Sequence, residues 1–133
     1  MAIVNSYVYT STVFLWDKFE EATGNNYLVV ATRPYKDKKG VLPDGISMTL
    51  QVLSDTYDYG LDKRTNKPRE SNLYCCFDVT VLNDKLQVKK GDRIQLLEYD
   101  ETHSYVISFD LILRFRDAKV LQSPTQAQGV NRK

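Results

Sequence analysis

The sequence contains few of the residues that form disulfides, metal centres and nucleophilic active sites. Its 133 residues include only two cysteines and one histidine. Cys75 and Cys76 are adjacent, and neighbouring residues of a strand point to opposite faces, so this pair is poorly placed to form a disulfide or to share a metal ion. His103 lies in a charged turn, Asp100-Glu101-Thr102-His103. We therefore expect two reduced cysteines and no metal site.

Catalytic motifs are missing as well. The chain has no Gly-rich phosphate-binding loop and no Ser or Cys nucleophile paired with a plausible base. The carboxylate pair Glu20-Glu21 is typical of an exposed helix. These absences argue against an enzyme and against a cofactor.

Long hydrophobic runs and an excess of one charge are also absent. The apolar stretches are far shorter than the roughly 20 residues that a helix needs to cross a bilayer, and the N-terminus lacks a basic segment followed by an apolar one. Lys and Arg (18) nearly balance Asp and Glu (17). We expect a soluble cytoplasmic protein with no membrane partner, and any affinity for a polyanion must come from local patches.

The length fits one domain, and the composition is that of a folded protein, with 42% hydrophobic residues, nine Tyr and five Phe. Period-2 alternation, turn residues and β-branched content predict strands at Tyr27–Arg33 (stopped by Pro34), Ile46–Val52, Leu73–Leu82, Ile94–Leu96 and Tyr105–Leu121, the last with a bend near Arg116-Asp117. Trp16 to Ala22 has the spacing of a short helix, which Gly24 would end. With no regular strand–helix alternation, this pattern favours a small barrel or a Greek-key sheet.

One segment carries a more specific pattern. In Leu86-Gln87-Val88-Lys89-Lys90-Gly91-Asp92-Arg93-Ile94-Gln95-Leu96, a basic Gly-Asp turn leads into an alternating strand and then into a hairpin to the last strand. This pattern resembles the closing hairpin of OB-fold single-stranded DNA-binding proteins, particularly the divergent small ones of phages and conjugative plasmids. The resemblance covers about the C-terminal third, Leu86 to Leu121. It implies an all-β, five-stranded OB-type Greek-key barrel and sequence-independent binding of single-stranded DNA in replication or transfer of a mobile element.

The chain departs from the cellular members of that family at its end. It closes on Gly129-Val130-Asn131-Arg132-Lys133 and lacks the acidic tip that those proteins use to recruit replication partners. Recruitment by that route is therefore not implied. We divide the chain into an arm with a short helix (1–24), a barrel (25–121) and a flexible polar tail (122–133).

Binding of single strands needs cations along the backbone path and aromatic faces for the bases. Two segments supply both kinds of residue. The first holds Arg33, Tyr35, Lys36, Lys38 and Lys39, and the second holds Tyr57, Tyr59, Lys63, Arg64, Lys67 and Arg69. Because loops between the early strands of an OB-fold flank its binding face, we expect the two loops to lie beside each other. The other reading of both segments is solvated turns, and for Tyr57 and Tyr59 the alternative is that the core of the domain covers their rings.

Three further side chains are candidates for the same surface. Tyr74 shares a predicted strand face with Asp78 and Thr80, and Arg114 and Arg116 lie opposite the apolar side of the last strand. Packing on a neighbouring strand, for the ring, and salt bridges to Asp110 or Asp117, for the arginines, are the alternatives.

The rival function is a structural or protein-interaction module, such as a virion component or an assembly adaptor. In that reading the segment Ile3 to Leu15, rich in β-branched and aromatic residues, adds a strand to the edge of a neighbouring molecule. The same arm could link DNA-bound copies, so self-association through residues 1–24 is expected in both cases. The sequence leaves RNA and duplex DNA open as further ligands.

Overall fold

The computed structural model describes residues 3–5, 8, 14–107 and 110–123. Within these ranges the chain forms one helix, α1 (Trp16–Thr23), and seven strands. The strands are β1 (Tyr27–Tyr35), β2 (Gly45–Val52), β3 (Cys76–Val81), β4 (Arg93–Tyr99), β5 (Tyr105–Ile107), β6 (Asp110–Ile112) and β7 (Arg114–Gln122). The predicted strand-rich chain with a single short helix is confirmed.

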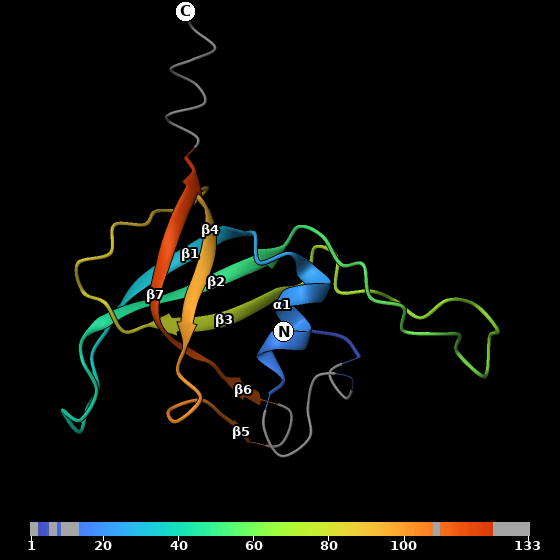
Figure 1. Cartoon of the computed structure of the whole chain (residues 1–133), viewed down its shortest axis with the longest axis horizontal. Helices are drawn as coiled ribbons and strands as arrows, with labels where there is room; N and C mark the ends of the chain where they lie inside the picture. Colours follow the sequence, from blue (N-terminus) through green and yellow to red (C-terminus); the bar gives the residue numbers. More distant parts are fainter. Residues whose placement is uncertain (1–2, 6–7, 9–13, 108–109, 124–133) are drawn as a thin grey trace, which may run out of the picture.

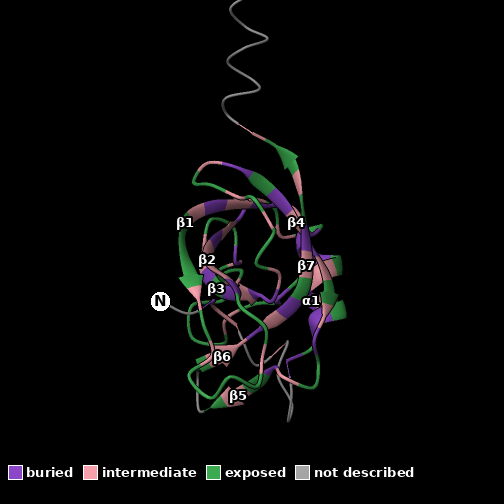
Figure 2. Ribbon diagram, turned by 90° about the vertical axis from the view of Figure 1, so that its left-hand side faces the viewer, coloured by how far each residue is buried: buried purple, intermediate pink, exposed green. Residues whose placement is uncertain are grey.

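Five of the strands close into a barrel in the order β1-β2-β3-β7-β4, while β5 and β6 form a separate two-stranded sheet below it (Figures 1 and 2). Neighbouring barrel strands are antiparallel except β3 and β7, which run parallel where Thr80 and Val81 meet Arg114 and Phe115. This closed five-stranded barrel is consistent with the predicted OB-type fold.

The barrel interior follows from the alternation seen in the sequence. On β2, Met48, Leu50 and Val52 are fully buried, and the β3 residues that pair with Met48 and Leu50 are also buried and hydrophobic. Ser47 and Thr49 occupy the outward positions on β2 and are partly exposed. A strand with one wet face was therefore predicted correctly here.

The helix α1 belongs to the same core as the barrel. Trp16, Phe19 and Ala22, spaced three residues apart, are its buried hydrophobic positions. The Trp16 ring packs edge-on against Phe115 of β7, with 4.8 Å between the two ring centroids. Gly24 ends the helix in the left-handed conformation, with φ of 77°, and donates its backbone N–H to Glu20 O at 2.8 Å. The helix before the barrel thus packs on its own chain.

Three predicted strand boundaries were wrong. Pro34 does not stop β1, which continues to Tyr35 with Pro34 paired to Ile46. The structure allows this because β4 pairs with β1 only at Tyr27 and Leu28, so over the rest of β1 a missing N–H can face a side with no strand.

The strand predicted from Leu73 begins only at Cys76, because Tyr74 has φ of 66° and belongs to a turn. Tyr74 is therefore not on a strand face with Asp78.

The single strand predicted from Tyr105 to Leu121 is divided into β5, β6 and β7. Its uniform parity concealed a chain reversal, since Tyr105 pairs with Ile112. The predicted change of parity is present, because Phe115 and Ala118 are both buried.

Candidate nucleic-acid interface

The two basic loops lie at opposite ends of the barrel, not beside each other as predicted. The β1–β2 loop (residues 36–44) and the β2–β3 segment (residues 53–75) leave from the two ends of β2 (Figure 1). Consecutive loops of an antiparallel sheet necessarily alternate between its two ends, and a strand of eight residues is roughly 25 Å long. The two sets of cations therefore cannot form one cluster.

The β1–β2 loop is shaped by a single carboxylate. Asp37 accepts hydrogen bonds from the backbone N–H groups of Val41 at 3.0 Å and Leu42 at 2.9 Å, and a longer one from Lys39. The bond from Leu42, followed by the other two amides, holds the pKa of Asp37 below its ordinary value. Because Asp37 is engaged with the backbone, the neighbouring lysines project from a defined turn.

A groove of about 530 Å³ lies between this loop, the β4–β5 turn and the start of β7. Its aromatic and cationic lining consists of Tyr35, Lys36, Lys38, Lys39, Tyr105 and Arg114. Val41 and Leu42 add apolar surface, and Val41 is 75% exposed. Five predicted site residues, four from the first loop and one from the last strand, are thereby brought together with a tyrosine, Tyr105, that was not predicted.

Arg114 lines the groove close to two tyrosine rings. Its guanidinium carbon lies 5.9 Å from the centroid of the Tyr35 ring and 5.8 Å from that of Tyr105. Its Nη1 donates to the backbone oxygen of His103 at 2.7 Å, which ties the side chain to the β4–β5 turn. Two aromatic faces and one cation are thus held in one arrangement by three separate elements.

Arg33 lies next to the groove on the outer face of the barrel. It makes an ion pair with Asp78 at 3.6 Å and a long hydrogen bond to Thr49 Oγ1 at 3.5 Å. Both partners of the ion pair are at least half exposed. The charge of Arg33 is therefore largely balanced locally.

Arg116 is engaged in a different place. Its Nη2 lies 2.9 Å from Asp100 Oδ2, a carboxylate that is almost completely buried. Neither predicted alternative partner, Asp110 or Asp117, is the one it pairs with. Arg116 stabilises the turn after β4 and does not line the groove.

The second basic segment ends in a short ribbon, residues 60–69, that projects from the barrel (Figure 1). Leu61 and Pro68 form an isolated antiparallel bridge, and the backbone oxygen of Asp62 accepts the amide of Asn66 at 2.7 Å. The exposed cations of its tip are Lys63, Arg64 and Lys67. Arg69, at the base, is partly buried and donates to Tyr59 O at 3.3 Å.

The two tyrosines of this segment have different environments. Tyr59 is only 7% exposed and its hydroxyl donates to Asp55 Oδ2 at 2.7 Å, while Asn72 Nδ2 donates to the same hydroxyl. Tyr57 is 37% exposed and lies under Lys18 of α1, with 5.0 Å between the ammonium and the ring centroid. Tyr59 is therefore a core residue, and its ring offers no face to a base.

Tyr74 is the most exposed of the predicted rings, at 64%. It precedes β3 and so lies at the ribbon end of β2, remote from the groove. Its backbone oxygen accepts a hydrogen bond from Gln51 Nε2 at 3.1 Å. Tyr74 therefore does not belong to the same surface as Tyr35 and Arg114.

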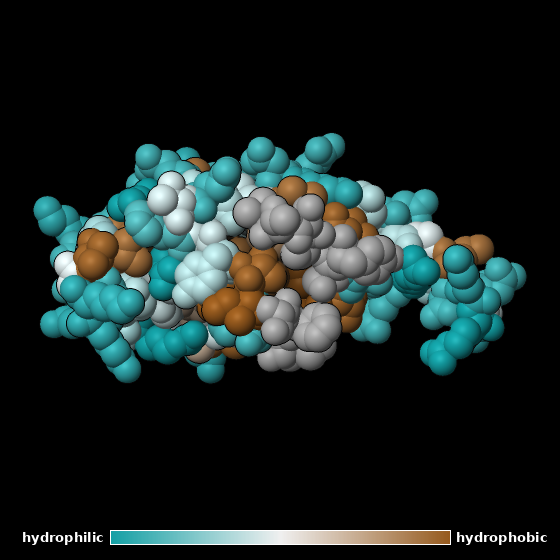
Figure 3. Space-filling model, turned by 90° about the horizontal axis from the view of Figure 1, so that it is seen from below, coloured by the Kyte–Doolittle hydropathy of each residue, from teal (hydrophilic) through white to brown (hydrophobic). Residues whose placement is uncertain are grey.

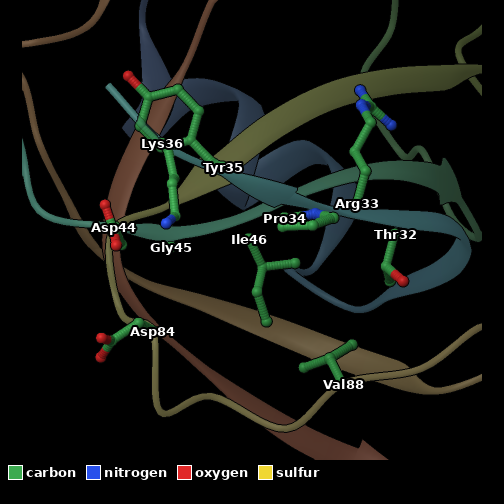
Figure 4. Close-up of a pocket in the computed structure, with 10 residues that line it drawn as sticks. All are labelled: Thr32, Arg33, Pro34, Tyr35, Lys36, Asp44, Gly45, Ile46, Asp84 and Val88. Carbon is green, nitrogen blue, oxygen red and sulfur yellow. The ribbon is translucent and has the colours of Figure 1, made fainter. Parts of the chain in front are cut away.

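A second pocket, of about 390 Å³, opens where β1 runs past the end of its pairing with β4. Figure 4 shows Ile46 and Val88 pointing toward one another across it, while Arg33 and Tyr35 point away. Asp44, Asp84 and Lys36 are also among its lining residues. A lining of mixed sign with two carboxylates does not favour a polyanion.

Sequence reasoning missed Tyr105, His103 and Val41. The parity of Tyr105 matches that of Phe115 and predicts an inward face, whereas β5 belongs to a separate hairpin that leaves Tyr105 45% exposed. The turn residues Asp100 to His103 were the available signal, since a loop before the last barrel strand flanks the binding face of an OB-type barrel.

The part of the chain that the structure describes holds neither a cluster of metal ligands nor a membrane-spanning helix. It contains no group of three His, Cys, Asp or Glu side chains that could hold a metal ion, and both cysteines are free thiols. None of its helices is both long and apolar enough to span a bilayer. Seen from below, hydrophilic side chains cover most of both ends of the molecule and hydrophobic ones gather in the middle (Figure 3).

Comparison with known proteins gave no match to a family model, to a curated protein or to a solved structure.

Proposed function

We propose that the groove between the β1–β2 loop and the β4–β5 turn binds single-stranded DNA without sequence preference. The observation that carries this proposal is the position of the Arg114 guanidinium, within 6 Å of both the Tyr35 and Tyr105 rings, in a groove that three lysines line. The place of the groove supports it, because the corresponding loops of OB-type barrels contact oligonucleotides.

The chemistry of the lining matches the two parts of a nucleotide. Exposed aromatic faces stack on bases, at about 1–3 kcal/mol for each base, and do so with any base because all bases have a π face. Lys36, Lys38 and Lys39 are all exposed and can contact phosphates, which releases counterions. Stacking requires unpaired bases, which is why a single strand is favoured over a duplex.

The positive charge of the groove favours DNA over other ligands that OB-type barrels bind. OB-type barrels also bind oligosaccharides, which are neutral and do not need a cluster of cations. Lys36, Lys38, Lys39 and Arg114 face only one carboxylate within the lining, that of Asp37, and it is hydrogen-bonded to the backbone. A polyanion is therefore the better match. We place its role in replication or transfer of a mobile element, as the resemblance implies.

The test is fluorescence anisotropy with a labelled oligo(dT) at low salt and over a salt series. We expect binding whose affinity falls steeply with salt. The variant Lys36→Gln/Lys38→Gln/Lys39→Gln should lose at least about tenfold in affinity at low salt, and Tyr35→Ala/Tyr105→Ala should also weaken binding.

The ribbon supplies the matched control. Lys63→Gln/Arg64→Gln/Lys67→Gln removes the same three charges from the opposite end of β2 and should change affinity by less than about threefold. Equal losses of affinity in the two triple variants would show that the affinity depends on the net charge of the protein and not on the groove. No binding by the natural protein at low salt would overturn the proposal.

A further inference from the structure

The only histidine in the sequence lies beside the groove with one of its two ring nitrogens already engaged. His103 Nδ1 is 2.8 Å from Asp100 Oδ2, and the backbone N–H of His103 donates to Asp100 Oδ1 at 3.2 Å. Ser104 closes the same turn by donating its hydroxyl to Asp100 O at 2.7 Å. The ring is therefore held in one orientation by its own turn.

Asp100 fixes which nitrogen carries the proton. Burial of this carboxyl opposes its ionisation, but the side-chain and backbone hydrogen bonds from His103 and the charge of Arg116 outweigh burial and hold the pKa of Asp100 below its ordinary value. An ionised carboxylate only accepts hydrogen bonds, so Nδ1 carries a hydrogen at neutral pH. Gain or loss of the second proton consequently takes place at Nε2.

Nε2 is available to a ligand. Among the contacts of the described residues it has no hydrogen-bond partner, the side chain is 34% exposed, and His103 lines the groove. The Arg114 guanidinium donates a hydrogen bond to the backbone carbonyl of His103, so the imidazole ring and the guanidinium lie along one stretch of the groove. The charged and titratable groups around the ring are Asp100 and Arg116 behind it, Glu101 and Tyr105 on its own segment, Arg114 from β7, and Tyr35, Lys36, Asp37, Lys38 and Lys39 from the facing side.

We propose that His103 is a proton-dependent phosphate ligand in the groove, donating from Nε2 to a phosphate oxygen only when the imidazole is protonated. The inference rests on the proposed function, since the phosphate is that of the bound strand. A neutral imidazole with its hydrogen on Nδ1 presents a lone pair at Nε2, which repels a phosphate oxygen. The imidazolium presents an N–H and a positive charge at the same place.

The first test measures affinity and its salt dependence at two pH values. Anisotropy with oligo(dT) is suited to this because thymine does not titrate between about pH 5.5 and 8, the range in which an imidazole changes its charge. One additional cation on a single strand steepens the slope of log K against log salt by about 0.7. We expect that steepening at about pH 5.5 relative to pH 8, with an affinity about tenfold higher at low salt, the factor of one charge-assisted hydrogen bond.

The matched variant is His103→Gln, which removes the titration and keeps a polar side chain. Its affinity and its salt slope should each be the same at about pH 5.5 as at pH 8, whatever their absolute values. The role of His103 would be overturned, with groove binding intact, by either of two results. One is that the natural protein has the same salt slope at both pH values, and the other is that the slope of the variant still steepens at about pH 5.5. Absence of binding at either pH would instead count against the groove itself.

A second measurement uses the natural protein alone, so it does not depend on whether a variant folds. Because the chain has one histidine, its ring resonances can be followed by NMR through a pH titration without ambiguity. A proton that strengthens DNA binding must itself be bound more tightly in the complex. The midpoint of the imidazole titration should therefore move to higher pH when oligo(dT) is added, and an unmoved midpoint would contradict the proposal.

Discussion

Asp100 shows how a single buried carboxylate can organise a turn that a sequence pattern leaves featureless. It is 8% exposed and receives hydrogen bonds or an ion pair from His103 and Arg116. A charge taken out of water is tolerated only when such partners surround it. The β4–β5 turn therefore depends on this side chain being ionised.

The pH dependence of stability follows from the direction of the Asp100 shift. Its pKa in the folded chain is lower than the ordinary value of 3.8, so the stabilisation is fully present above pH 3.8 and is lost as the pH falls through the lower, folded value. Asp100→Asn should accordingly be less stable than the natural protein at neutral pH, and the difference should shrink at acid pH. Urea unfolding at about pH 7, 4 and 3 measures it, and a difference that is constant with pH would contradict it.

Individual exposures are where the sequence was least informative. Tyr57 and Tyr59 are two residues apart in one polar stretch, yet only Tyr59 enters the core. Its burial depends on Asp55 and Asn72, which receive and give the hydroxyl hydrogen bonds. Polar partners brought together by a loop leave no periodic trace in a sequence, so the core was only an alternative for both rings and could not be assigned to Tyr59 alone.

The first residue of β2, Gly45, has no room for a side chain. A Cβ placed on Gly45 would overlap the backbone carbonyl of Val81, the last residue of β3. Backbone cannot yield as the end of a flexible side chain can. Gly45 is therefore required by the close approach of β2 and β3 beside the second pocket, the one of about 390 Å³.

Gly45→Ala should lower the free energy of unfolding by about 1–3 kcal/mol, the usual cost of forcing extra volume into a packed site. Chemical denaturation measures this. The matched control is Gly40→Asn in the adjoining loop, where φ is 67° and a Cβ would meet nothing within 4 Å beyond its chain neighbours. Asn adopts this conformation with less strain than other side chains, so the control should lower the free energy of unfolding by less than about 1 kcal/mol. Equal effects of the two substitutions would contradict the packing argument.

Strand prediction succeeded where alternation and burial coincide and failed where they do not. β2 and the second half of the predicted Leu73–Leu82 strand alternate cleanly because one face is buried in the barrel. In the β5–β6 hairpin, Val106 and Leu111 pack against the core and Tyr105 is exposed. An unbroken strand would show the same alternation, but Tyr105 would be assigned to its buried face and Val106 to its exposed face. Period-2 patterns locate faces but do not locate reversals.

At the scale of the whole molecule, the described residues form one core that joins α1 to the barrel. Phe19 is fully buried and its ring contacts Trp16 of α1, Tyr27 of β1 and Phe77 of β3. A helix attached in this way cannot detach without exposing aromatic surface from three elements.

Helix and barrel should consequently unfold together. Trp16 is the only tryptophan, so its fluorescence reports on the helix while far-UV circular dichroism reports mainly on the strands. The two denaturation curves should coincide, and Phe19→Ala should shift both equally by about 3–5 kcal/mol. A fluorescence transition that precedes the loss of strand signal would show that α1 is a separate unit.

The overall barrel was predictable because strand number, strand length and the Gly-Asp turn agree with one architecture. The arrangement of the candidate site was not, because the expectation placed two loops together that the antiparallel order of β1, β2 and β3 holds apart. What the fold brings to the β1–β2 loop instead is the β4–β5 turn, separated from it by about half the chain. Composition alone identified the cations and not their neighbours.

The position of Pro34 has a consequence for how copies of this protein behave when crowded. The second half of β1 has a barrel neighbour only on the β2 side, and a row of unpaired backbone groups is a template on which another chain can add a strand and begin to aggregate. Proline has no N–H to offer such a strand. The residue that was expected to end β1 thus protects its edge against association of the native molecules.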